Sequence, residues 1–125
     1  MILLLDAHAL LWALADDPTL GREARDAIAS PANDVLVSAA VVWELAIKQA
    51  LGKLDAPHDL PSVIEATGFV GLPITLADAE AAAGLPPHHR DPFDRMLVAQ
   101  ARRLGAVVVT RDPALTTYGI DILLA

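Results

Sequence analysis

Short apolar runs alternate along this chain with longer stretches in which apolar residues recur at helical spacing. The short runs have the length of strands, and most of them are separated by one or two of the helical stretches. This alternation predicts an α/β fold with a parallel sheet that helices cover on both faces. The five runs expected to form strands are Ile2–Leu5, Asp34–Ser38, Phe69–Thr75, Ala106–Thr110 and Ile120–Leu124.

Local signals mark where several of the predicted helices begin or end. Thr75 is followed three residues later by Asp78, which is the spacing of a capping box at a helix start. Asp91 precedes Pro92, and proline is favoured at the first helical position. Gly105 is a suitable residue to end the helix that begins there. The expected helices are Ala7–Asp16, Gly21–Ser30, Ala39–Leu54, Leu60–Thr67, Leu76–Ala83 and Pro92–Leu104.

The chain has 125 residues, no internal repeat and no linker, so we expect a single domain over residues 1–125. The opening run Met1–Leu5 is too short for a signal peptide or a membrane span. The absence of cysteine excludes disulfides, thiolate catalysis and cysteine-based metal sites. We therefore expect a protein of the reducing cytoplasm that has no membrane association.

The formal net charge of −7 argues against a general nucleic-acid binder, because lysine and arginine normally supply most of the affinity for phosphates. That argument weakens if many of the acidic residues bind a metal ion. A bound cation reverses the local field and can itself contact a phosphate. The overall charge therefore decides little about function.

Acidic residues follow predicted strands at the edge where parallel sheets bind ligands. Asp6 comes directly after the first strand, and Asp112 comes just after the fourth. Ser38 ends the second strand and leads into a helix that carries Glu44, while Asp94 lies in the first turn of the helix before the fourth strand. We expect these acidic side chains to meet at one edge of the sheet.

Each of these residues also has a purely structural explanation. Asp6, Asp91 and Asp112 stand where helix N-caps are expected, and Asp94 occupies a first turn in which the helix dipole favours negative charge. Glu44 and Lys48 are spaced for an ordinary i,i+4 ion pair. Taken one at a time, the acidic residues are therefore explained by capping and pairing.

The surroundings of Glu44 indicate more than pairing. Residues 39–47 are apolar on nearly all sides, so the helix is expected to be largely buried, and a buried carboxylate needs a partner. That partner is either Lys48 or a metal ion shared with the other acids. Oxygen ligands favour Mg²⁺ or Mn²⁺. Zinc is disfavoured because the histidines lack ligand spacing, and His88 and His89 are expected at the surface or at a phosphate-binding rim.

Taken together and in order, these sequence blocks resemble a PIN-domain ribonuclease, and specifically the VapC toxins of toxin–antitoxin pairs. The resemblance covers essentially the whole chain. Any one block is weak evidence, but all of them in this order and spacing are specific. The blocks are Leu3–His8, Val37–Lys48, Arg90–Ala101 and Thr110–Asp112.

The resemblance implies a four- to five-stranded parallel sheet and an endoribonuclease that depends on Mg²⁺ or Mn²⁺. It also implies a VapB-like antitoxin protein that neutralises the enzyme. Thr110 is expected to bond to the acidic cluster, and Asp91 is expected to act as a cap beside it. The catalytic and metal-binding residues implied are Asp6, Glu44, Asp94 and Asp112.

RNA is expected to be held by a local basic rim, because the chain has few basic residues overall. Arg95 and Arg111 are expected to steady the phosphate. A homodimer is also expected, since Trp12, Trp43 and two largely apolar helices offer more apolar surface than one small sheet covers. The rim residues are Lys48, Lys53, His88, His89 and Arg90.

Two other classes of protein remain as alternatives. A non-catalytic interaction module would keep the fold and use its apolar helices to bind a partner. The complete acidic set argues against that reading. A phosphatase or receiver-like phosphoacceptor also places aspartate after parallel strands, but the motif Asp6-Ala7-His8 lacks the second aspartate that such a phosphatase needs.

Overall fold

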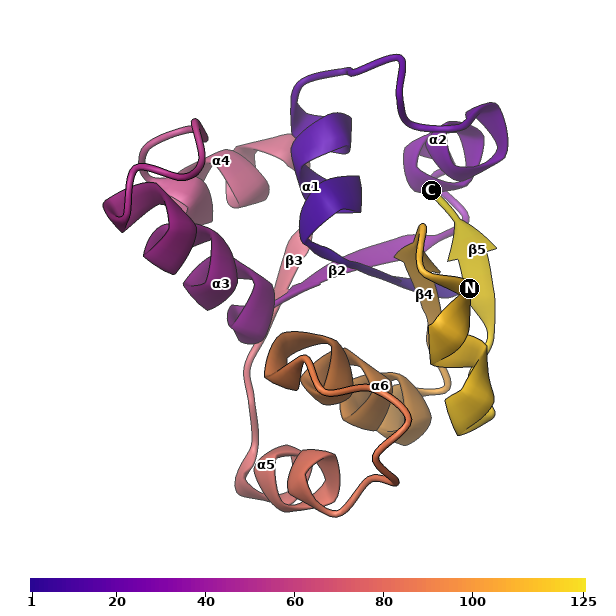
Figure 1. The fold of residues 1–125 in the computed structure, drawn as a ribbon. Coiled ribbons are helices and arrows are strands. Elements are labelled where there is room, and N and C mark those ends of the chain that lie inside the picture. Colours follow the sequence, from indigo (N-terminus) through magenta and orange to yellow (C-terminus); the bar gives the residue numbers. More distant parts are fainter.

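The computed structural model describes residues 1–125, which form a five-stranded parallel sheet in the order β3-β2-β1-β4-β5. In Figure 1, α1 and α2 lie above the sheet and α5 and α6 lie below it. The predicted α/β architecture, with helices on both faces of a parallel sheet, is therefore confirmed. The elements are β1 (Ile2–Leu5), α1 (Ala7–Leu14), α2 (Arg22–Ala29), β2 (Asp34–Ser38), α3 (Ala39–Ala50), α4 (Leu60–Thr67), β3 (Val70–Leu72), α5 (Leu76–Ala83), α6 (Pro92–Leu104), β4 (Val107–Thr110), the 3₁₀ helix η1 (Pro113–Tyr118) and β5 (Ile122–Leu124).

The central strand β1 sets the register of the sheet. It pairs with β2 on one side and with β4 on the other, and Leu3, Leu4 and Leu5 are fully buried. Leu5 is aligned with Val109 at the carboxyl end of β4, and the backbone N–H of Asp6 donates to the Val109 carbonyl at 3.1 Å. The carboxyl ends of these two strands therefore meet side by side, as expected for parallel strands.

The predicted boundaries differ from the structure mainly at chain reversals. The strand expected over residues 69–75 is only three residues long, and Pro73 follows its end because proline cannot donate to a strand partner. The helix expected to reach Leu54 ends at Ala50, two residues before Gly52, whose φ is +68°. The helix η1 was not predicted, although Pro113 stands at its first position.

The predicted helix caps are present. The Thr75 hydroxyl accepts from the backbone N–H of Asp78, whose carboxylate in turn accepts from the Thr75 N–H. The Asp91 carboxylate accepts from two backbone N–H groups at the start of α6, and Gly105 ends that helix in the left-handed conformation. None of the helices combines the length and the apolar character that a membrane crossing requires.

Asp78 is buried and also anchors α5 to α6 through an ion pair with the partly exposed Arg103, which leads to a testable prediction. Arg103 donates to both carboxylate oxygens, at 2.7 Å and 3.0 Å, and these bonds are the main reason that the pKa of Asp78 falls from 3.8 to about 2. We expect Asp78→Asn to lower the free energy of unfolding at pH 7 by about 2 kcal/mol.

The pH dependence of this loss follows from the direction of the shift. Because the folded-state pKa lies below the unfolded-state value of 3.8, the stabilisation is present above pH 3.8 and is lost as the pH falls toward 2. Denaturant melts of wild type and Asp78→Asn should therefore converge in acid. Asp26→Asn is the control, since Asp26 forms only an exposed pair with Arg22 and should change little. A constant gap between wild type and Asp78→Asn across this range would contradict the account.

Candidate metal centre

The carboxyl ends of β1 and β4 open into a cavity of about 670 Å³, and most of the residues that line it are polar or charged. Residues from α1, α3, α6 and the turn after β4 complete it. The structure thus brings the four acidic residues singled out from the sequence to one place. Asp91 lines the cavity as well, so the acidic residues of the cavity lining are Asp6, Glu44, Asp91, Asp94 and Asp112.

Asp6 and Asp112 combine a capping role with a place in the cavity. One carboxylate oxygen of Asp6 accepts from the Ala9 N–H at 2.8 Å, and one oxygen of Asp112 accepts from the Ala114 N–H at 3.0 Å. Each cap uses the Oδ1 atom and leaves Oδ2 free of backbone donors. The structural explanation of these residues is therefore correct, and it does not exclude a second role for the same carboxylates.

Asp91 and Asp94 differ in how their carboxylates are used. Asp91 Oδ1 accepts from the Phe93 N–H at 2.8 Å and from the Asp94 N–H at 3.2 Å, so its side chain is committed to capping α6. Asp94 receives no backbone hydrogen bond, and its side chain is 22% exposed. Asp94 is therefore the residue of this pair that is free to bind a ligand in the cavity.

The electrostatics around Asp94 favour a bound cation. Burial raises the pKa of Asp94 to about 7, and the neighbouring charges of Asp91, Asp6 and Glu44 add to the rise while His89 opposes it. A divalent ion among these carboxylates would remove their mutual repulsion and favour the ionised form. The donor set is rich in carboxylate oxygen, which fits Mg²⁺ or Mn²⁺.

Glu44 meets the cavity from α3 and forms the expected pair with Lys48. The Lys48 ammonium lies 2.8 Å from Glu44 Oε2, and this hydrogen bond is the main cause that raises the pKa of Lys48. The Glu44 side chain is only 11% exposed. The expectation that this helix is largely buried was wrong, because Trp43 is 62% exposed and Ile47 is 38% exposed. The helix buries one face and leaves a second apolar face in solvent.

His89 was expected at the rim, but its contact with the acidic residues was not predicted. Its Nε2 lies 2.9 Å from Asp112 Oδ2 and 3.3 Å from Asp94 Oδ2, so it joins the acidic cluster directly. Both histidines of the loop were expected at the surface or at a phosphate-binding rim; His88 is exposed, whereas His89 is partly buried against the acidic residues. No local signal distinguishes the two rings, because the approach of His89 depends on how the loop folds back.

Two of the residues expected beside the phosphate are engaged elsewhere. Both terminal nitrogens of Arg95 donate to backbone carbonyls of residues 82–89, and Arg95 does not line the cavity. Arg111 lines the cavity, but it donates to the carbonyls of Thr19 and Ala125 and lies 4.4 Å over the Trp12 ring. Both guanidinium groups therefore hold the fold together in this structure.

The remaining candidates lie at the edge of the site. Thr110 is buried, and its hydroxyl accepts from the backbone N–H of Asp112 at 3.1 Å, so it fixes the turn rather than a carboxylate. Lys48 lines the cavity. Arg90 and Lys53 are exposed and do not line it.

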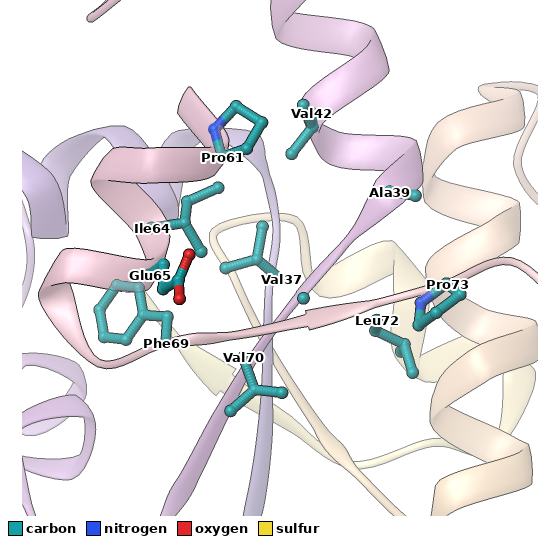
Figure 2. A pocket seen from close by; sticks show the side chains of 11 residues that line it. Val37, Ala39, Val42, Pro61, Ile64, Glu65, Phe69, Val70, Leu72 and Pro73 are labelled. Atoms are coloured by element: carbon teal, nitrogen blue, oxygen red, sulfur yellow. The ribbon is translucent and has the colours of Figure 1, made fainter. Parts of the chain in front are cut away.

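A second cavity, of about 650 Å³, lies between α4 and β3. Figure 2 shows its walls, with Val37 and Val42 facing Ile64 and Phe69 across the opening. Glu65 is the only ionisable residue in the lining, so the cavity has no group of residues suited to catalysis.

Comparison with known proteins gives the family and the fold. The family model for the PIN domain matches residues 3–120. No match is found among curated protein sequences. The fold is shared with the VapBC2 complex of Rickettsia felis bound to promoter DNA, at 14% identity and a TM-score of 0.69 over 98% of each chain.

Two further solved structures share the fold. The DNA-bound VapBC of Salmonella typhimurium is 22% identical with a TM-score of 0.67, covering 98% of this chain and 97% of that one. FitAcB of Neisseria gonorrhoeae is 19% identical with a TM-score of 0.67, covering 99% and 97%. Since the family model spans nearly the whole sequence, this chain belongs to the PIN domain family.

Proposed function

We propose that this protein is a VapC-type toxin, an endoribonuclease that depends on Mg²⁺ or Mn²⁺ and hydrolyses RNA phosphodiester bonds. The observation that carries the proposal is the meeting of Asp6, Glu44, Asp94 and Asp112 in one cavity, although they lie far apart in the sequence. Membership of the PIN domain family supports it. A non-catalytic interaction module would have no need for this complete set of carboxylates.

The proposed ligands are Asp6, Asp94 and Asp112, each of which has at least one carboxylate oxygen free of backbone donors. When bound there, the divalent ion would supply Lewis acidity toward the scissile phosphate and the attacking water. Helix α6 presents Asp94 from its first turn, where the helix dipole favours the ionised carboxylate. Capping of α1 and η1 fixes the backbone on which Asp6 and Asp112 stand.

Glu44 is the residue we assign to orient the attacking water and to accept its proton. Both oxygens of Asp112 already accept hydrogen bonds, from Ala114 and from His89, so Asp112 is less suited to this task. Glu44 Oε2 accepts from Lys48, and Oε1 accepts no hydrogen bond. Lys48 thereby holds Glu44 Oε2 and adds a positive charge beside the expected phosphate path.

RNA hydrolysis by the purified protein tests the proposal. We expect cleavage of RNA with Mg²⁺ or Mn²⁺, no cleavage in EDTA, and a loss of at least about 100-fold in Asp6→Asn, because the ion could no longer be held correctly. Asp26→Asn serves as the control variant, because Asp26 is exposed on α2 and does not line the cavity. Equal cleavage by Asp6→Asn and wild type would refute the assignment of this site.

We further propose a homodimer and a VapB-like antitoxin partner. The structures of similar fold include toxin–antitoxin complexes, such as one from Klebsiella pneumoniae with a TM-score of 0.62. An apolar stripe along α3, formed by Trp43 and Ile47 and continued by Leu51 just after the helix, is exposed and supports a protein interface. Trp12 is less suited to this role, since its ring stacks with His8 and lies under the Arg111 guanidinium within its own chain.

The dimer gives a prediction for the α3 stripe. We expect light scattering to report a dimer at tens of micromolar, and Trp43→Ala together with Leu51→Ala to shift the mass to that of the monomer, because apolar contacts dominate such interfaces. Leu76→Ala is the control, since Leu76 is 93% exposed but lies on α5. A monomeric wild type at this concentration would contradict the proposed homodimer.

A further inference from the structure

The imidazole of His89 lies between two of the proposed metal-binding carboxylates. Its Nε2 is 2.9 Å from Asp112 Oδ2 and 3.3 Å from Asp94 Oδ2. Ligand atoms of these three residues all fall within 4.8 Å of one another. These distances allow His89 to be either a nitrogen ligand of a metal ion or a hydrogen-bond donor to the carboxylates. A ligand needs a lone pair on Nε2, whereas a donor needs a hydrogen on Nε2.

The other ring nitrogen decides between these roles. The backbone N–H of Asp91 donates to His89 Nδ1 at 3.1 Å, so Nδ1 must present its lone pair. A neutral imidazole has one lone-pair nitrogen and one N–H, so the hydrogen resides on Nε2. The nitrogen that faces Asp112 and Asp94 is therefore a donor, and it has no lone pair to give to a metal ion.

The loop that carries His89 is held from two sides. Tyr118 accepts from the His89 backbone N–H at 2.8 Å and donates to the Pro86 carbonyl at 2.8 Å. Arg95 donates to the His89 carbonyl at 3.1 Å and to the Leu85 carbonyl at 2.8 Å. These bonds come from α6 and from η1, so the imidazole is placed by the fold of the domain rather than by its own short loop.

We propose that His89 is a positioning residue of the metal centre, whose Nε2–H donates to Asp112 and thereby orients that carboxylate beside Asp94, and which does not itself bind the metal. The inference rests on the proposed function. Groups that hydrogen-bond to metal ligands fix the direction of the ligand oxygens, and their loss typically weakens metal binding about 10- to 100-fold. Arg95 and Tyr118 do not contact the carboxylates in this role; they hold the loop that carries His89.

The first test reads the protonation of His89 in the wild-type protein. Nitrogen-15 NMR of the histidine rings distinguishes a protonated from an unprotonated Nε2, and the His89 signals are identified by their absence in His89→Gln. We expect the Nε2–H form both without metal and at saturating Mg²⁺. Loss of the Nε2 hydrogen when Mg²⁺ binds would show a nitrogen ligand and would overturn the proposal.

The second test measures metal affinity by calorimetric titration without RNA. His89→Ala should weaken Mg²⁺ and Mn²⁺ binding by a similar factor of about 10 or more, because the loss acts through the carboxylates. His89→Gln, which restores an N–H donor, should recover most of the affinity. His88→Ala is the control, since His88 is the exposed neighbour in the same loop.

The outcomes separate this inference from the proposed function. If His89→Ala binds Mg²⁺ and Mn²⁺ as tightly as wild type does, the proposed role of His89 is wrong, but the proposed metal centre is unaffected. A much larger loss for Mn²⁺ than for Mg²⁺ would indicate a nitrogen ligand and would also overturn it, since Mg²⁺ favours oxygen. Failure of the wild type to bind either ion would refute the metal centre, and the role of His89 with it.

Discussion

Asp94→Asn is expected to abolish RNA cleavage while leaving the metal-free protein at least as stable as wild type. Asparagine keeps the shape of the side chain but removes the charge that a metal ion requires, so we expect activity to fall by about 1,000-fold or more. In the metal-free protein the same charge is unfavourable, because burial and three neighbouring carboxylates oppose ionisation of Asp94.

The pH dependence of stability provides the second part of this prediction. The folded-state pKa of Asp94 is raised from 3.8 to about 7, so between these values the folded protein retains a proton that the unfolded chain releases. The free energy of unfolding therefore falls as the pH rises through this window, by at most about 4 kcal/mol. Asp94→Asn lacks this fall, and its advantage in EDTA should grow from pH 4 to pH 7 and then level off.

Asp91→Ala is the matched variant, because Asp91 lies three residues earlier and also lines the cavity. Its carboxylate caps α6, so we expect a loss of about 1 kcal/mol in stability and substantial remaining activity. Denaturant melts in EDTA and RNA cleavage in Mg²⁺ measure the two effects. A stable but inactive Asp91→Ala beside an active Asp94→Asn would show that the two roles are reversed.

Mg²⁺ or Mn²⁺ is expected to raise the melting temperature of the protein. An ion that binds only the folded state at 100 times its dissociation constant adds about 2.7 kcal/mol, which corresponds to a shift on the order of 10 °C for a domain of this size. Thermal melts at matched ionic strength should show the shift in wild type, and Asp6→Asn should lose most of it.

Two controls make this result specific to the cavity. Asp26→Asn should retain the full shift, because its carboxylate is exposed on α2 and pairs only with Arg22. Monovalent salt at the same ionic strength should give a much smaller effect. A shift of equal size in monovalent salt, or an unchanged shift in Asp6→Asn, would argue against a metal ion in this cavity.

Much of the fold could be predicted because its strands are short apolar runs between helices with clear caps. The strands Ile2–Leu5 and Asp34–Ser38 and the helix Pro92–Leu104 match the prediction in full. The edge strands β3 and β5 are shorter than predicted. The residues that flank β3 and β5 in the sequence are also largely apolar. The sequence therefore does not mark where each edge strand stops pairing with its one neighbouring strand.

The acidic residues of the site could be predicted for a related reason. Asp6 and Asp112 follow parallel strands, and the carboxyl ends of such strands meet at one edge. The environments of His89 and Arg95 could not be predicted in this way. His89 reaches the cluster through bonds to Tyr118 and Arg95, and such contacts between distant segments leave no periodic signal in the sequence.

The most direct test of the metal centre is to locate Mn²⁺ by anomalous X-ray scattering in crystals of a preparation that cleaves RNA. We expect a peak in the cavity between β1 and β4, with oxygen atoms of Asp6, Asp94 and Asp112 within about 2.3 Å and His89 Nε2 outside bonding distance. A peak bound by other residues, or no peak in the cavity of an active preparation, would contradict it.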